Sequence, residues 1–168
     1  MAICGYTKHL LTSEQKRTDF RPERSDMSMM HSKACSLVVT YITQTVSKIR
    51  QQLDGKNRLI MLHELGVRLH RIIYEHLLTF QYNSLGAMLA ICDVNEYRTC
   101  IKQLDDGDLV SLFDVLHALC NLLVVPTDNL KQICVGEPLN SLDKPTLYSF
   151  IQLREDFKTE RLGNILGR

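Results

Sequence analysis

Three histidines and two glutamates stand within fourteen residues of this sequence, in the stretch HELGVRLHRIIYEH from His63 to His76. Such a density of imidazole and carboxylate groups is typical of helices that bind a metal or carry a general acid or base. The first two residues also match the start of the metalloprotease motif, in which a second histidine follows four positions after the first. Here that position is Val67 and the next histidine is His70, so the motif is incomplete.

The spacing of the three histidines excludes one shared metal site on this helix. His63 and His70 point to the same side, together with Val67 and Tyr74, but seven residues separate them by about 10.5 Å along the axis. Metal–nitrogen bonds are only about 2 Å long. His76 falls on the opposite, apolar face. We therefore expect exposed histidines at 63 and 70 and a core or inter-helix histidine at 76.

A second candidate is Asp114-x-x-His117-x-x-x-Asn121, which puts three polar groups on one helix face. A carboxylate and a histidine at this spacing occur in di-metal bundles, but those bundles need matching ligands on partner helices. The chain contains no second Asp/Glu-x-x-His. We expect a narrow polar stripe here, and we keep as an alternative a small metal-dependent helical enzyme that uses Asp114 and His117 with His76 or His70.

Other catalytic signatures are missing from the sequence. It has no glycine-flanked serine elbow, no phosphate-binding P-loop and no Gly-x-Gly-x-x-Gly. Gly66 and Gly86 lie inside helical patterns, where a glycine more often permits close helix packing than cradles a phosphate. We therefore expect no catalytic residues, no cofactor-binding residues and no metal ligands.

Composition points to an ordinary globular domain. The chain has 168 residues, of which 45% are hydrophobic and 23% charged, enough for a substantial core. The 20 basic and 19 acidic residues give a net charge of +1, and no basic run stands out, which argues against a nucleic-acid partner. Arg154, Lys158 and Arg161 near the C-terminus have acidic neighbours, so we expect a solvated face of mixed charge there.

The six cysteines show no Cys-x-x-Cys spacing, and most have apolar neighbours in the sequence. We expect all six to be free thiols in a reduced, intracellular compartment. The N-terminus lacks the pattern of a secretory signal, and no apolar run is long enough to span a bilayer.

The secondary structure that carries these side chains is predicted to be helical throughout, because apolar residues recur at helical spacing and no sustained strand alternation occurs. The predicted fold is an all-α antiparallel helical bundle, a segment of a helical rod. Expected helices cover Ala2–Asp19, Cys35–Leu53, Asn57–Tyr82, two short helices within Ser84–Lys102 (split by an Asp93-x-x-Glu96 capping box), a central helix capped by Asp108 and ended by Pro126, Asp128–Cys134, and a last helix capped by Asp143.

Three segments follow from this pattern. Residues 1–20 form a helix that we expect to continue a rod lying upstream, 21–33 form a loop, and 34–168 form the C-terminal helical bundle. We also expect an exposed apolar patch at the N-terminal end, because the first helix and the central helix carry more apolar surface than this chain can cover.

Five blocks in fixed order carry a family resemblance: HELGVRLHRIIYEHL, GAMLAICDVNEYR, LFDVLHALCNLLVV, DNLKQIC and LYSFIQLREDF. Together they resemble the C-terminal end of the exocyst complex component five family, subunits of the complex that tethers secretory vesicles to the plasma membrane. The segment Arg21–Lys33 and the terminal RLGNILGR depart from the family pattern.

The resemblance implies a non-catalytic helical-rod subunit that is cytoplasmic and peripheral at plasma-membrane sites of exocytosis. It implies other exocyst subunits as partners, with peripheral contact to plasma and vesicle membranes, and it leaves small GTPases open. An adaptor for small GTPases or membrane surfaces is a third reading.

Overall fold

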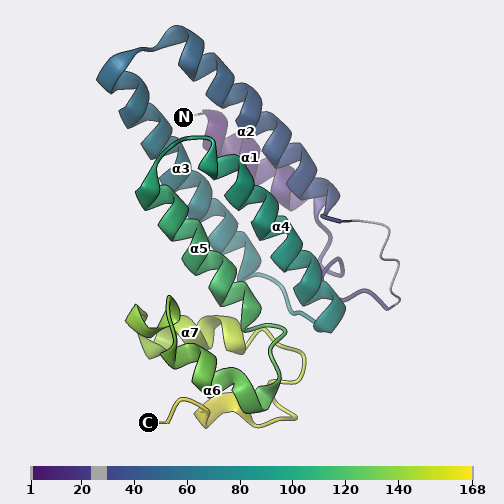
Figure 1. Cartoon of the computed structure of the whole chain (residues 1–168). Coiled ribbons are helices and arrows are strands. Elements are labelled where there is room, and N and C mark those ends of the chain that lie inside the picture. Colours follow the sequence, from purple (N-terminus) through teal and green to yellow (C-terminus); the bar gives the residue numbers. More distant parts are fainter. Residues whose placement is uncertain (1, 24–29, 168) are drawn as a thin grey trace.

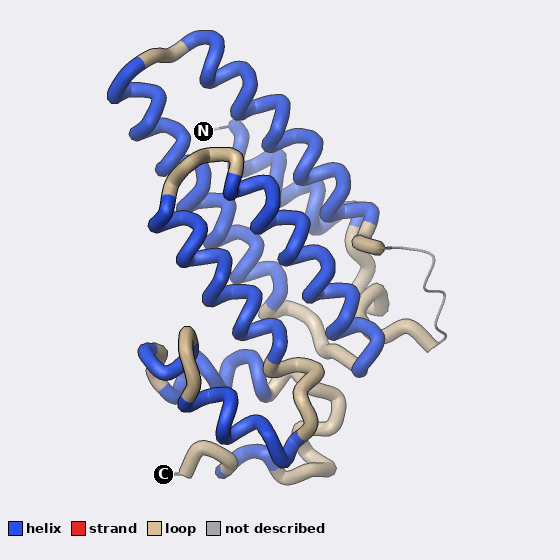
Figure 2. Tube along the Cα trace, in the orientation of Figure 1, coloured by secondary structure: helices blue, strands red, loops and turns tan. Residues whose placement is uncertain are grey.

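The computed structural model describes residues 2–23 and 30–167, and within them the all-α prediction is confirmed (Figure 2). Seven α-helices and two short 3-10 turns account for the regular structure of this part of the chain. The elements are α1 (Ala2–Glu14), α2 (Lys33–Gln52), α3 (Gly55–Leu77), α4 (Ser84–Lys102), α5 (Gly107–Asn121), α6 (Thr127–Val135), η1 (Leu139–Ser141), α7 (Lys144–Ile151) and η2 (Leu162–Asn164).

Four long helices, α2 to α5, run up and down beside one another and form the bundle (Figure 1). The shorter α1 packs against α2 and α3, α4 packs against α2 and α5, and α3 packs against α5. The chain from α6 onward folds below the end of α5, which contacts both η1 and α7. None of the helices in the described ranges combines the length and apolar character needed to cross a bilayer.

The first helix is shorter than predicted. It ends at Glu14, and the backbone N–H of Lys16 then donates to the Asp19 carboxylate at 2.9 Å, which closes a turn where the apolar pattern predicts helix. Of the loop expected at 21–33, residues 24–29 lie outside the described residues. Lys33 already belongs to α2, whose N-cap is Ser32.

The predicted break in the middle of Ser84–Lys102 is wrong, because α4 is one continuous helix. Asp93 has the sequence pattern of a local capping box, but it is buried and forms hydrogen bonds with a segment that is distant in the sequence. Its carboxylate accepts from the Ser32 backbone N–H at 2.6 Å and from the Ser32 hydroxyl at 2.7 Å. The Ser32 hydroxyl in turn accepts from the N–H of Cys35, so a side chain of α4 supports the N-cap of α2.

Later helix ends also differ from the prediction. The cap of α5 is Asp106, whose carboxylate accepts from the N–H groups of Asp108 and Leu109, and not Asp108 itself. The helix ends at Asn121, before Pro126. The last helix, α7, has Asp143 as N-cap as predicted, but it stops at Ile151.

Arg154 fixes the path of the chain after α7. The prediction of a solvated position for this residue is wrong, because it is buried. Its guanidinium donates to the carbonyls of Leu122 and Val125 at 2.8 and 2.6 Å, and it forms a two-pronged pair with Asp156. Arg154 thereby satisfies carbonyls left open at the end of α5 and ties the C-terminal segment to the bundle.

A very close backbone approach brings the loop after α1 against the first turn of α4. A Cβ atom on Gly86 would lie 1.6 Å from the carbonyl oxygen of Phe20, a separation that no side chain permits. Phe20 itself is fully buried and packs edge-on against Phe80 with ring centroids 4.9 Å apart. A glycine at position 86 is therefore needed to seat this loop.

Gly86→Ala should destabilise the protein by about 2 kcal/mol or more, because relieving the clash requires movement of backbone. Gly5→Ala is the matched control, since Gly5 is exposed on α1 with open space around its Cβ position. This control should be neutral or stabilise by about 0.5 kcal/mol. Urea denaturation of the three proteins measures the difference, and equal midpoints for the two variants would contradict the packing described.

Asp93 should make stability depend on pH. Burial raises the pKa of this carboxyl to about 6, while its bonds to Ser32 act in the opposite direction. The folded protein therefore holds the proton more tightly than the unfolded chain, and the resulting stabilisation, present below about pH 4, is lost as the pH rises through 6. The pKa difference corresponds to about 3 kcal/mol.

The test compares free energies of unfolding of wild type and Asp93→Asn between pH 4 and 7. The wild type should lose stability relative to the variant as the pH rises, because asparagine does not ionise. Burial lowers the pKa of His76 to about 4, an effect of opposite sign that both proteins share and that cancels in the comparison. Asp54→Asn, at a more accessible position, serves as control. Parallel curves for wild type and Asp93→Asn would refute the prediction.

Candidate functional site

His63 joins α3 to the start of α5. Its Nδ1 atom lies 2.7 Å from a carboxylate oxygen of Asp106, and this hydrogen bond raises the pKa of His63. The same bond lowers the pKa of Asp106, which is already the N-cap of α5. The side chain of His63 remains 45% exposed. Its role in the fold is to hold two helices together at one end.

The prediction of an exposed His70 is wrong. This residue is half-buried between α3 and α5, and its ring meets Phe113 edge-on with centroids 5.3 Å apart. Burial lowers the pKa of His70, so the ring is neutral at physiological pH. Periodicity alone puts this side of α3 toward solvent, but α5 packs against it.

His76, predicted to be a core or inter-helix histidine, is half-buried and joins α3 to the segment after α1. Its Nε2 atom lies 2.8 Å from the side-chain oxygen of Gln15, in the segment after α1. Since that oxygen only accepts hydrogen bonds, the Nε2–H of His76 is the donor. The ring also packs edge-on against Phe80, and burial lowers the pKa of His76 to about 4. The three histidines therefore have three separate surroundings.

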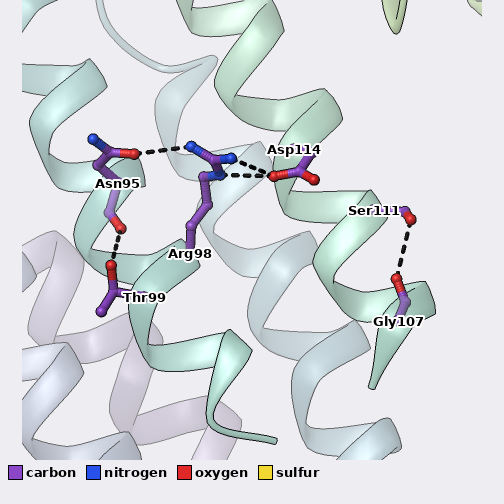
Figure 3. Close-up of polar contacts among 6 residues, drawn as sticks. All are labelled: Asn95, Arg98, Thr99, Gly107, Ser111 and Asp114. Atoms are coloured by element: carbon purple, nitrogen blue, oxygen red, sulfur yellow. Dashed lines mark hydrogen bonds and ion pairs between the residues drawn. The ribbon is translucent and has the colours of Figure 1, made fainter. Parts of the chain in front are cut away.

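The second candidate, Asp114 with His117, is engaged with α4. Arg98 reaches across from α4 and donates to the Asp114 carboxylate through Nε at 2.9 Å, while another of its nitrogens donates to Asn95 (Figure 3). Burial and the neighbouring Arg98 lower the pKa of His117. No group of three or more histidine, cysteine, aspartate or glutamate side chains suited to a metal forms within residues 2–23 and 30–167.

Five of the cysteine thiols have pKa values above the ordinary value of a thiol. Cys35, Cys100, Cys120 and Cys134 are buried, and burial raises the pKa of each of these thiols. Cys92 is exposed, and its thiol pKa is also raised. A thiol with a raised pKa stays protonated at neutral pH, and only the thiolate attacks or binds metal.

An apolar groove of about 510 Å³ lies between α3 and α5, and we call it the α3–α5 groove. One wall comes from α3 and the other from α5, and Leu142 and Thr146 close the end nearest α7. The α3 wall consists of His63, Val67, His70 and Tyr74, and the α5 wall consists of Asp108, Ser111, Leu112, Val115, Leu116 and Leu119.

A second exposed apolar surface lies at the tip of the α2–α3 hairpin, which extends past the turn between α4 and α5 (Figure 1). Leu59 and Ile60 are 63% and 57% exposed there, and Met61 is also exposed. On α1, Leu10 and Leu11 are buried against the bundle, whereas Tyr6 remains exposed. The expectation that the first helix leaves its apolar residues uncovered is therefore wrong for Leu10 and Leu11, and the exposed apolar residues at this end of the bundle lie on the first turns of α3.

The groove was missed by the sequence reasoning although its signal was present. Periodicity puts His63, Val67, His70 and Tyr74 on one side of the helix, and these four residues form the α3 wall. Because two of the four residues are histidines, we expect that side of the helix to be exposed to solvent. The wide apolar arc of α5, which indicates contact with several neighbours, supplies the opposite wall.

Comparison with known proteins gives one consistent family. The family described as exocyst complex component Sec10-like, alpha-helical bundle, matches residues 1–166. Exocyst complex component 5 of Homo sapiens is 53% identical over 162 residues, and that of Drosophila melanogaster is 49% identical over 165 residues. Exocyst complex component SEC10a of Arabidopsis thaliana is 33% identical over 167 residues.

The three alignments cover 96%, 98% and 98% of the present chain, in the same order. They cover 23%, 23% and 20% of the relatives, so the chain spans less than a quarter of the length of the proteins it matches. The matched part is the C-terminal region of the human and fly proteins.

The protein should retain no stoichiometric zinc, iron or manganese through purification, and EDTA should leave its Tm unchanged. The reason is that Asp114 is held by Arg98 and that the three histidines do not converge. Elemental analysis and thermal unfolding with and without the chelator test this. Asp114→Ala is a useful companion, because it should lower the Tm by removing the partner of Arg98, equally in both conditions. One bound metal per chain, with a Tm that falls in EDTA, would contradict us.

Proposed function

Because the chain belongs to the Sec10-like α-helical-bundle family of exocyst complex components, we propose that it acts as a non-catalytic subunit of the exocyst. The observation that carries the proposal is the family match over residues 1–166. In this role the bundle contributes to tethering secretory vesicles to the plasma membrane before fusion. It works by presenting helix faces to other proteins and not by chemistry on a substrate.

The distribution of polar groups supports a role without catalysis. The polar side chains that could most plausibly serve in catalysis are engaged in bonds between distant segments of the chain: Asp93 with Ser32, His76 with Gln15, and Asp114 with Arg98. The described part of the chain also presents apolar helix surface outward, including the α3–α5 groove. Surfaces of this kind suit protein contacts.

We propose the other exocyst subunits as partners, since the relatives are named as components of that complex. The setting is the cytoplasm, with peripheral association at plasma-membrane sites of exocytosis. Small GTPases and the surfaces of plasma and vesicle membranes are further contacts that the same exposed helix faces would serve.

A metal-dependent enzyme, the alternative considered from the sequence, is not favoured by any observation. Its ligands would be Asp114 and His117 with His76 or His70. Asp114 is paired with Arg98, while His76 bonds to Gln15 and His70 packs against Phe113. These side chains therefore face different neighbours and do not converge on one site.

The proposal predicts that the tagged chain, expressed at native level, co-purifies with other exocyst subunits and co-sediments with them as a large assembly. Tag alone is the control for recovery. Gly86→Ala, which disturbs the seat of the loop on α4, should reduce recovery in proportion to its loss of stability. Recovery of a small GTPase, or binding to lipid vesicles, without any exocyst subunit would replace the proposal with the adaptor reading.

A further inference from the structure

The α3–α5 groove lies where two neighbouring helices of the bundle meet, and α1 packs on a similar line of contact between α2 and α3. Around the bundle, α1 packs on both α2 and α3, while α3 and α5 pack on each other. The α2–α3 seam is thus covered by a helix, α1, which buries Leu10 and Leu11 there. In the described residues, α7 meets the α3–α5 seam at one end, where Thr146 lines the groove and Phe150 packs on Tyr74, and a groove of about 510 Å³ remains along the seam.

The groove has the length and pattern of a helix seat. On α3 its wall repeats at His63, Val67, His70 and Tyr74, the spacing of one helix face. From His63 to Tyr74 the helix rises by about 16 Å, or three turns. Apolar side chains of α5 form the facing ridge, and Leu112 is 36% exposed there. Ridges at such spacing accept the side chains of a third helix.

Two carboxylates stand at one end of the groove, where His63 offsets part of their charge because its bond to Asp106 raises its pKa. Asp108 lines it, and Asp106 stands at the same end, bonded to His63. Within the described ranges, neither lysine nor arginine is among the residues that line the groove. An occupant that covers the apolar walls must therefore meet negative charge at the end formed by the start of α5, and a cation on the occupant is the complementary group.

We infer that the α3–α5 groove binds an amphipathic helix of a partner protein, with an apolar stripe along Val67, Leu112 and Val115 and a lysine or arginine toward Asp108. This inference makes the proposed function more specific. It rests on that function only in naming the protein that supplies the helix, which is another subunit of the same complex. The groove itself is tested with the isolated chain and with synthetic helices.

The probes are two peptides of about 14 residues, each with leucines at coiled-coil a and d spacing. One carries lysines at the remaining positions and the other carries glutamates. Fluorescence anisotropy with the purified chain should show the lysine peptide binding at least about tenfold more tightly than the glutamate peptide, because the carboxylates at the end of the groove attract the one and repel the other.

Leu112→Glu should weaken binding of the lysine peptide at least about tenfold, although it adds a negative charge that would strengthen any non-specific attraction. Val135→Glu adds the same charge at an exposed apolar site on α6 and should have no such effect. Asp108→Asn should reduce the preference for lysine over glutamate without abolishing binding.

Ser111→Arg, at an exposed position of the same wall, provides a variant that leaves the core untouched. It should weaken the lysine peptide and strengthen the glutamate peptide, while circular dichroism confirms that each variant is folded.

Several results would overturn the inference: no binding of either peptide, equal loss with Leu112→Glu and Val135→Glu, or Leu112-dependent binding of anionic lipid vesicles in place of peptide. A concentration-dependent dimer abolished by Leu112→Glu would show that a second copy fills the groove. If the lysine peptide binds as described but no exocyst subunit co-purifies with the chain, the groove stands and the proposed function fails.

Discussion

One buried carboxylate sets the arrangement of the N-terminal half of the molecule. Asp93 is 3% exposed, and a charge in that position must have partners, because an unpaired buried charge costs several kcal/mol. Its partners are the backbone and hydroxyl of Ser32, which caps α2. The position at which α2 starts is therefore determined by a residue on α4. With Gln15 bonded to His76, the segment after α1 is fixed against α3 in the same way.

Arg154 has the same function for the C-terminal segment of the chain. Its bonds to the Leu122 and Val125 carbonyls and to Asp156 allow the C-terminal segment to fold back under α5. The backbone bridge between Tyr82 and Arg154 then joins this segment to the loop before α4. Buried polar groups here specify which elements meet, and the apolar core supplies most of the stabilisation once they do.

The fold class and most helices could be predicted from the sequence, because helical periodicity depends only on neighbours along the chain. Three of the errors occurred where a residue acts on a distant segment. Asp93 has the local pattern of a cap, yet it supports the cap of another helix. His70 stands on the polar side of its own helix, yet α5 covers it. Arg154 follows a short helix, and the charged residues near it in the sequence are typical of an exposed surface, yet its side chain is buried because it donates to a carbonyl at the end of α5. Periodicity indicates which face of a helix is apolar, and it does not identify the element that packs against each face.

The same limit explains why the groove escaped the sequence analysis. An enzyme site is visible in a sequence because it needs rare groups at set spacing, whereas a helix-binding surface is made of ordinary residues such as Val67, Leu112 and Val115. Its specificity comes from how two helices that are distant in sequence lie side by side, and from one charge at the end, Asp108. Close packing of Gly66 on Leu109 brings α3 and α5 together at that end. The glycine predicted to permit close helix packing thus helps to define the walls of the surface that we expect a partner to bind.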